Sequence, residues 1–86
     1  MPDRLIGKNV EIVVTFAMAL NNVGLAPIAY YGILKAVDEE YCVLSLRYMK
    51  PVIAVSKIFN SDLGENCAGD IYIRKEYIVT CRELQQ

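Results

Sequence analysis

The 86-residue sequence predicts a single all-β domain, and three observations support this class. Short runs rich in β-branched and aromatic residues recur along the chain, as they do in strands. Glycine, proline, asparagine and aspartate, which favour turns, separate these runs. No long stretch shows the 3.6-residue apolar period of an amphipathic helix. These features are typical of a small barrel or sandwich.

The N-terminal segment predicts a short helical turn followed by a strand. Residues 2–8 fit one helical turn that Gly7 ends. Residues 10–14 are rich in valine and isoleucine and predict the first strand. Residues 15–29 are ambiguous, because they fit a strand extension, a short helix or a connecting loop. The expected apolar contacts of the first turn are Leu5 and Ile6.

The middle of the chain predicts two strands joined by an acidic turn. Residues 30–37 form the expected second strand, and Gly32 within it indicates a bulge or a sharp bend. Residues 38–40 supply the turn, and residues 41–48 form the expected third strand. Its alternation assigns Cys42, Leu44 and Leu46 to one face and Tyr41, Val43, Ser45 and Arg47 to the other.

The last third predicts a loop and a final pair of strands. Lys50-Pro51 interrupts the third strand, after which residues 52–59 fit another extended stretch. Residues 60–66 have the composition of a turn or loop. The final strands are residues 70–74 and 77–81, separated by Lys75-Glu76.

The composition predicts burial against another molecule. Hydrophobic residues make up 55% of the chain, more than a monomer of this size easily hides, so some should face another chain or lipid. Nine basic residues against ten acidic ones give no overall attraction for nucleic acid, although local patches remain open.

The 23 uncharged residues from Ile12 to Leu34 are long enough to span a bilayer as a helix or to resemble a signal peptide. Polar amides and helix breakers within the run argue against a membrane-spanning helix. Acidic residues near its start argue against a signal peptide. The opposing residues are Asn21, Asn22, Gly24, Pro27, Asp3 and Glu11. We therefore expect two strands around a loop and no membrane segment.

The residue inventory argues against an enzyme, a metal site and a cofactor. The chain has no histidine, no glycine-rich phosphate loop and no nucleophile elbow. The cysteines are odd in number and widely spaced, which fits buried, reduced thiols in a cytoplasmic protein better than zinc ligands or disulfides. They are Cys42, Cys67 and Cys81.

Two segments together resemble the motifs of the Sm/LSm/Hfq-like family. Residues 32–38 have the form G-x-L-x-x-h-D, where h is apolar, as in the first Sm motif. Residues 71–78, an apolar strand running into Ile73-Arg74, resemble the second. Residues 7–12 are similar to the entry into the first strand of the family. In order and spacing the resemblance covers the chain from end to end, with longer segments at 15–29 and 50–69.

The resemblance implies a five-stranded, strongly bent SH3-like barrel that begins with a short helix. It also implies a homo-oligomeric ring in which the fourth strand of one subunit pairs with the fifth strand of the next. Independently, residues 77–81 contain no proline or lysine to blunt a free sheet edge. The candidate interface residues are Ile71, Tyr72, Ile73, Tyr77, Ile78, Val79, Thr80 and Cys81.

The usual ligand of the family is uridine- or adenine-rich single-stranded RNA, and the resemblance assigns candidate contacts. The base-holding positions are occupied by Glu40, Cys42 and Arg74, of which only Arg74 matches the family. Glu40 offers no flat face for stacking, and a thiol cannot replace an amide that both donates and accepts. The full candidate set is Asp38, Glu40, Cys42, Arg74 and Lys75.

Each candidate also has a purely structural interpretation. The acidic turn at residues 38–40 fits a solvated loop, and Arg74 fits a residue held by carboxylates, such as Asp38. The resemblance places Tyr41 in the core, whereas Tyr72 and Tyr77 fit the subunit contact. Two hypotheses follow: an Sm-like ring that binds RNA with a degenerate uridine pocket, or a ring that serves as a protein-interaction scaffold without RNA. The number of subunits stays open.

Overall fold

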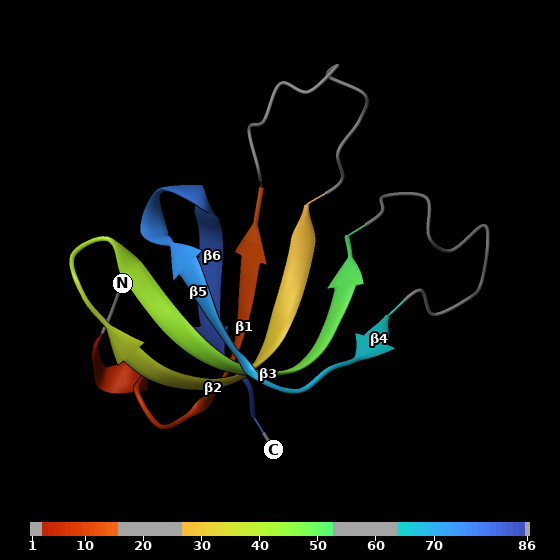
Figure 1. Ribbon diagram of the computed structural model, residues 1–86, viewed down its shortest axis with the longest axis horizontal. Helices are drawn as coiled ribbons and strands as arrows, with labels where there is room; N and C mark the ends of the chain where they lie inside the picture. The colour runs from red at the N-terminus through yellow and green to blue at the C-terminus, as the bar shows by residue number, and fades with distance from the viewer. Residues whose placement is uncertain (1–2, 16–26, 53–63, 86) are drawn as a thin grey trace.

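The chain folds into a curved antiparallel β-sheet (Figure 1). The structure is a computed structural model, and it describes residues 3–15, 27–52 and 64–85. Two short 3-10 turns accompany the strands. The elements are η1 (Asp3–Leu5), β1 (Asn9–Val14), β2 (Ile28–Val37), β3 (Tyr41–Pro51), β4 (Glu65–Asn66), β5 (Asp70–Arg74), η2 (Lys75–Tyr77) and β6 (Ile78–Glu83). The prediction of an all-β chain with a short N-terminal helical turn is confirmed.

The strand order places the last two long strands at opposite ends of the sheet. The order is β4-β3-β2-β1-β6, and β5 pairs with β3 beside β4. Although only η2 separates β5 from β6 in sequence, no ladder joins them among the described residues. The sheet is therefore open there, and β5 and β6 each use one edge for pairing within the described chain.

The two longest strands bend because their pairing is irregular. The register of β2 against β3 shifts between Tyr31 and Gly32 and again between Leu34 and Ala36, and both strands curve across the molecule (Figure 1). A Cβ atom at Gly32 would overlap the backbone carbonyl oxygen of Ser45. Only glycine lets the two backbones approach this closely. The bulge expected at Gly32 is confirmed.

The strands predicted at residues 10–14, 30–37, 41–48, 70–74 and 77–81 exist, but several of their ends differ from the prediction by one to three residues. Lys50-Pro51 does not interrupt the third strand, because Pro51 is its last residue and pairs with Ile28 at the start of β2. A proline is tolerated at the end of a strand because the ladder needs no further N–H group there. The final strand begins at Ile78 rather than Tyr77, because η2 occupies Lys75–Tyr77.

The segments between the long strands are only partly described. Glu65–Asn66 pairs with β3 as a two-residue strand, whereas a loop was predicted over residues 60–66. Val52 follows β3 outside any strand, and the rest of the extended stretch predicted at 52–59 lies outside the described residues. The same holds for residues 16–26 of the ambiguous segment.

The N-terminal turn covers one end of the curved sheet. Gly7 has φ 90°, a conformation that glycine adopts without strain, and its N–H donates to the Leu34 carbonyl over 2.7 Å. This contact ends the turn and leads the chain into β1. Leu5 is buried in the core as expected, whereas Ile6 is exposed.

The core lies inside the curvature and follows the predicted alternation. Leu44 and Cys42 are fully buried and Leu46 nearly so, as expected for one face of β3. Burying a large aliphatic side chain stabilises the fold by about 1.5–3 kcal/mol. The remaining members of the core are Leu5, Val10, Ile12, Val14, Leu34 and Ile73.

The long uncharged run is not one helix. Its first residues, Ile12 to Val14, lie in β1, and its last, Ile28 to Leu34, lie in β2, which pairs antiparallel with β1. Across residues 3–15, 27–52 and 64–85, no helix is long and apolar enough to cross a membrane.

Candidate nucleic-acid interface

The two segments that resemble Sm motifs meet where the β2–β3 turn lies beside the start of η2. The Lys75 N–H donates to the Glu40 carbonyl over 2.8 Å. The Lys75 ammonium donates to the Asp38 carbonyl, also over 2.8 Å. Three of the sequence-predicted RNA residues are thus brought together by hydrogen bonds between residues more than thirty positions apart in sequence.

Asp38 holds the turn in shape. Its carboxylate accepts hydrogen bonds from the Tyr41 and Glu40 N–H groups, over 2.7 and 2.8 Å. These backbone donors lower the pKa of Asp38, because they stabilise the charged carboxylate. The side-chain oxygen Oδ1 is therefore engaged within the turn. Asp38 acts as a structural residue that positions Glu40 and Tyr41.

Arg74 contacts a ring and a carboxylate, but the carboxylate is not Asp38. Its guanidinium carbon lies 5.7 Å from the centre of the Tyr41 ring, and Nη1 donates to the Tyr41 hydroxyl over 3.5 Å. Its Nε is 3.4 Å from a carboxylate oxygen of Glu76. The Glu76 charge raises the pKa of Arg74, so the group stays cationic. The expected ion pair with Asp38 is replaced by a pair with Glu76, two residues away.

Cys42 faces the core and leaves the candidate interface. It is fully buried, and this burial raises the pKa of its thiol to about 11. A protonated, enclosed thiol cannot contact a nucleotide from solvent. The strand alternation that was read from the sequence already placed Cys42 beside Leu44 and Leu46 on this face. Glu40, by contrast, is exposed at the tip of the turn.

Tyr41 is not a core residue, contrary to the expectation drawn from the resemblance. It lies on the opposite face of β3 from Cys42, which we call the outer face, and pairs with Arg74 of β5. Its ring meets that of Tyr72 edge-on, with centroids 6.5 Å apart and planes at 79°. Tyr72 is 70% exposed. Tyr41 itself is half-buried, and the alternation along β3 was the signal that could have placed it on the outer face.

The candidate interface residues on β5 and β6 divide into core and surface groups. Ile73 belongs to the core at 5% exposure. Ile71, Tyr77, Ile78 and Cys81 pack against it from partly buried positions. The remaining three, Tyr72, Val79 and Thr80, are exposed. Only these three have side chains that stand largely free of the core.

Val79 lies at a bulge in β6. The register of β6 against β1 shifts there, so that Thr80 pairs with Val13 and Ile78 with Val14. Val79 is left without a direct partner on β1 and is 57% exposed. The edge strands β5 and β6 therefore each carry one large exposed hydrophobic residue, Tyr72 on β5 and Val79 on β6.

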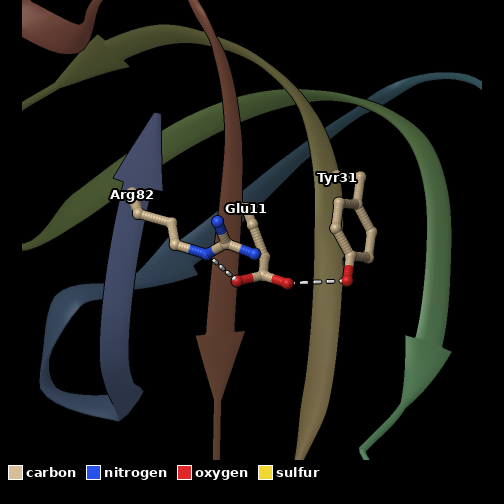
Figure 2. A network of polar contacts seen from close by, with 3 residues as sticks. All are labelled: Glu11, Tyr31 and Arg82. Carbon is tan, nitrogen blue, oxygen red and sulfur yellow. Dashed lines mark hydrogen bonds and ion pairs between the residues drawn. The ribbon is translucent and has the colours of Figure 1, made fainter. Parts of the chain in front are cut away.

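A second polar cluster, which no sequence motif predicts, spans β6, β1 and β2 (Figure 2). The Glu11 carboxylate accepts hydrogen bonds from Arg82 and from the Tyr31 hydroxyl, each 2.7 Å long. The Arg82 hydrogen bond is the main cause of a lowered pKa at Glu11. Burial and the Glu11 contact raise the pKa of Tyr31 to about 12. Glu11 is thus the shared acceptor that links Arg82 of β6 to Tyr31 of β2.

The described residues hold no group of three potential metal ligands. Comparisons of the chain with family models, curated proteins and solved structures found no match.

Proposed function

We propose that this chain is a divergent Sm-like protein whose subunits join edge to edge into a closed ring. The observation that carries the proposal is the open sheet, in which β5 and β6 are terminal strands and sit next to each other in sequence. An unpaired edge invites a strand from a neighbour, and a repeated head-to-tail contact closes into a ring. Exposed Val79 on β6 is apolar surface that such a contact would cover.

We further propose that the ring binds single-stranded RNA at the paired turns. Arg74 and Lys75 place two cations at one position, and a ring repeats this position in every subunit. At the two positions where Sm proteins carry the stacking and base-reading groups, this chain has exposed Glu40 and buried Cys42. Binding is therefore expected to be weaker than in a pocket with the full set of groups, and to depend strongly on salt.

The ring is tested by native mass measurement of the purified protein. The expected result is a discrete oligomer that becomes smaller on Val79→Asp, because a charge at the seam opposes burial. Ile6→Asp is the matched control, since Ile6 is also exposed but lies outside the terminal strands. A wild-type protein that stays monomeric at micromolar concentration would overturn the ring.

RNA binding is tested with short U-rich and A-rich RNAs at two salt concentrations. We expect binding at low salt that weakens as salt rises. Arg74→Ala should reduce it, whereas Arg47→Ala, an exposed arginine farther along β3, should not. Circular dichroism of both variants checks that the fold persists. The absence of binding to either RNA at low salt would reject this part of the proposal.

A scaffold function without RNA is the second candidate, favoured by the exposed carboxylates of Glu39 and Glu40 and by the buried Cys42. Carboxylates at the turn repel phosphate. If the purified ring binds no RNA but retains a protein partner that Arg74→Ala leaves in place, the scaffold function replaces RNA binding.

A further inference from the structure

The outer face of β3 and β5 carries an aromatic pair, half-buried Tyr41 and exposed Tyr72. Tyr41 pairs with Arg74 and Val43 with Tyr72, so the two tyrosines are diagonal neighbours on adjacent strands. Diagonal positions are within reach of aromatic side chains, as the 6.5 Å separation of the rings shows. Tyr72 is the most exposed large hydrophobic residue among those described. Leaving such a ring in water gains nothing for folding.

The charges around the pair are balanced. Lys35 forms an ion pair with Asp70 at 2.8 Å, and Arg74 forms one with Glu76 at 3.4 Å. Glu40 adds a further exposed carboxylate at the neighbouring turn, and Lys75 adds a further ammonium. Because Lys35 and Arg74 are each paired with an exposed carboxylate, their attraction for phosphate is reduced but not abolished. The distinguishing chemistry of this surface is planar: two aromatic rings, with the flat Arg74 guanidinium over one of them.

We propose that Tyr41, Tyr72 and Arg74 form a stacking platform for a nucleobase of single-stranded RNA. This inference rests on the proposed RNA-binding function and assigns the base contact to the outer face of the sheet. Glu40 and Cys42 cannot provide that contact. Aromatic rings and arginine planes stack on the π-face of any base, so the platform selects bases over other groups without reading their sequence.

The platform is compatible with a ring built through the β5 edge. Side chains of a strand stand roughly perpendicular to the sheet, whereas its backbone groups point along the sheet to the next strand. A neighbouring subunit can therefore pair with the β5 backbone while the Tyr72 ring stays on the outer face.

A mononucleotide titration tests the platform independently of polymer binding. With the tyrosine rings isotope-labelled for NMR, we expect adenosine monophosphate to shift the ring signals of Tyr41 and Tyr72. Ribose 5-phosphate, which has the sugar and phosphate but no base, should leave them in place. Tyr31 is the internal control, because its hydroxyl is bonded to Glu11 and its signals should not move. If the Tyr41 and Tyr72 rings fail to respond to the mononucleotide, the platform is wrong, whatever the polymer does.

Binding of single-stranded RNA separates the platform from the proposed function. Tyr72→Ala should weaken binding about ten-fold, a loss in the range measured for one stacked base. Tyr72→Phe should retain it, because phenylalanine keeps the stacking plane. If wild type and Tyr72→Ala bind equally well, the RNA function stands and the platform is overturned. If Tyr72→Ala instead reduces the native mass, Tyr72 belongs to the subunit seam, which also overturns the platform.

Discussion

The outer face of the sheet carries two clusters of similar composition and opposite character. Both combine an arginine, a glutamate and tyrosine. In the first, Glu11 is only 14% exposed and both of its hydrogen bonds are 2.7 Å long. In the second, the contacts of Arg74 are 3.4 and 3.5 Å long, and its partner Glu76 is 58% exposed.

This difference separates a structural cluster from one that is free to bind. Short hydrogen bonds to a largely buried charged group stabilise a fold, because they replace the hydrogen bonds to water that this group loses on burial. Long contacts between exposed groups contribute little, because water competes with each of them. The first cluster thus fastens β6 to β1 and β2, while the second leaves Arg74 and Tyr72 free to meet a ligand. Four predictions test this contrast.

The largest effect is expected at Glu11. Glu11→Ala removes the shared acceptor of two hydrogen bonds and should lower the free energy of unfolding by about 1–2 kcal/mol. The expected loss is limited because the Arg82 side chain is 64% exposed, so water can solvate it when the Glu11 carboxylate is removed. Urea denaturation at fixed protein concentration measures it. Glu76→Ala is the matched control and should change stability by less than about 0.5 kcal/mol. Equal losses at the two positions would contradict the contrast.

The next largest effect is a loss of stability at high pH, caused by deprotonation of Tyr31. Its pKa is raised to about 12 in the folded protein, so between about pH 10 and 12 the folded state holds a proton that the unfolded state has lost. Stability therefore falls as pH rises through this window. Tyr31→Phe should lose less stability over the same range, as followed by thermal unfolding at several pH values. The raised pKa of Cys42, about 11, also lowers stability at high pH. This loss is the same in wild type and in Tyr31→Phe, so it does not affect the difference between them.

A smaller loss of stability is expected at low pH, caused by protonation of Glu11. Its folded pKa lies below the ordinary value, so stability is present above that value and is lost as pH falls through the folded pKa. The stability difference between wild type and Glu11→Gln should therefore narrow on acidification. Asp38, whose pKa is also lowered, titrates in both proteins and does not affect the difference. A difference that stays constant down to strongly acidic pH would disprove the role of the carboxylate charge.

The smallest effect on stability is expected at the aromatic pair. Tyr72 is 70% exposed, so Tyr72→Ala should change the free energy of unfolding by no more than about 0.5 kcal/mol. Tyr31→Ala should cost clearly more, because Tyr31 is partly buried and bonded to Glu11. Thermal unfolding of the two variants in parallel makes the comparison. A large loss at Tyr72 would show that its ring supports the fold.

The strands and the inward face were predictable because they depend on local pattern. The alternation over residues 41–48 correctly placed Cys42 and Leu44 inside, and β-branched content located β1. The bulge at Gly32 was predictable because few other roles explain a glycine within a strand. The end of the third strand was predicted too early, because Lys50-Pro51 was expected to interrupt it. A proline is tolerated at the last paired position of a strand, and only the pairing of Pro51 with Ile28 of β2 shows that Pro51 is that position.

The candidate site was predictable only as a set of residues. Four residues that the resemblance grouped, Asp38, Glu40, Arg74 and Lys75, come together in space, but the resemblance also included Cys42 and placed Tyr41 in the core. The alternation of β3 contradicted both of these assignments and was right. Strand period constrains the direction of a side chain more tightly than an inexact motif does, because one residue of shift moves it to the other face.

The sequence by itself determined the class of the fold, the positions of the main strands and the identity of the buried face, because these follow from the two-residue period and from turn chemistry. Only the tertiary structure decided which carboxylates hold which cations. Glu11 and Arg82 are 71 residues apart in sequence, and Arg74 pairs with Glu76 instead of Asp38. The first pair is set by the register of β1 against β6, which has no local signal in the sequence. The second depends on the conformation of η2, which follows β5 directly.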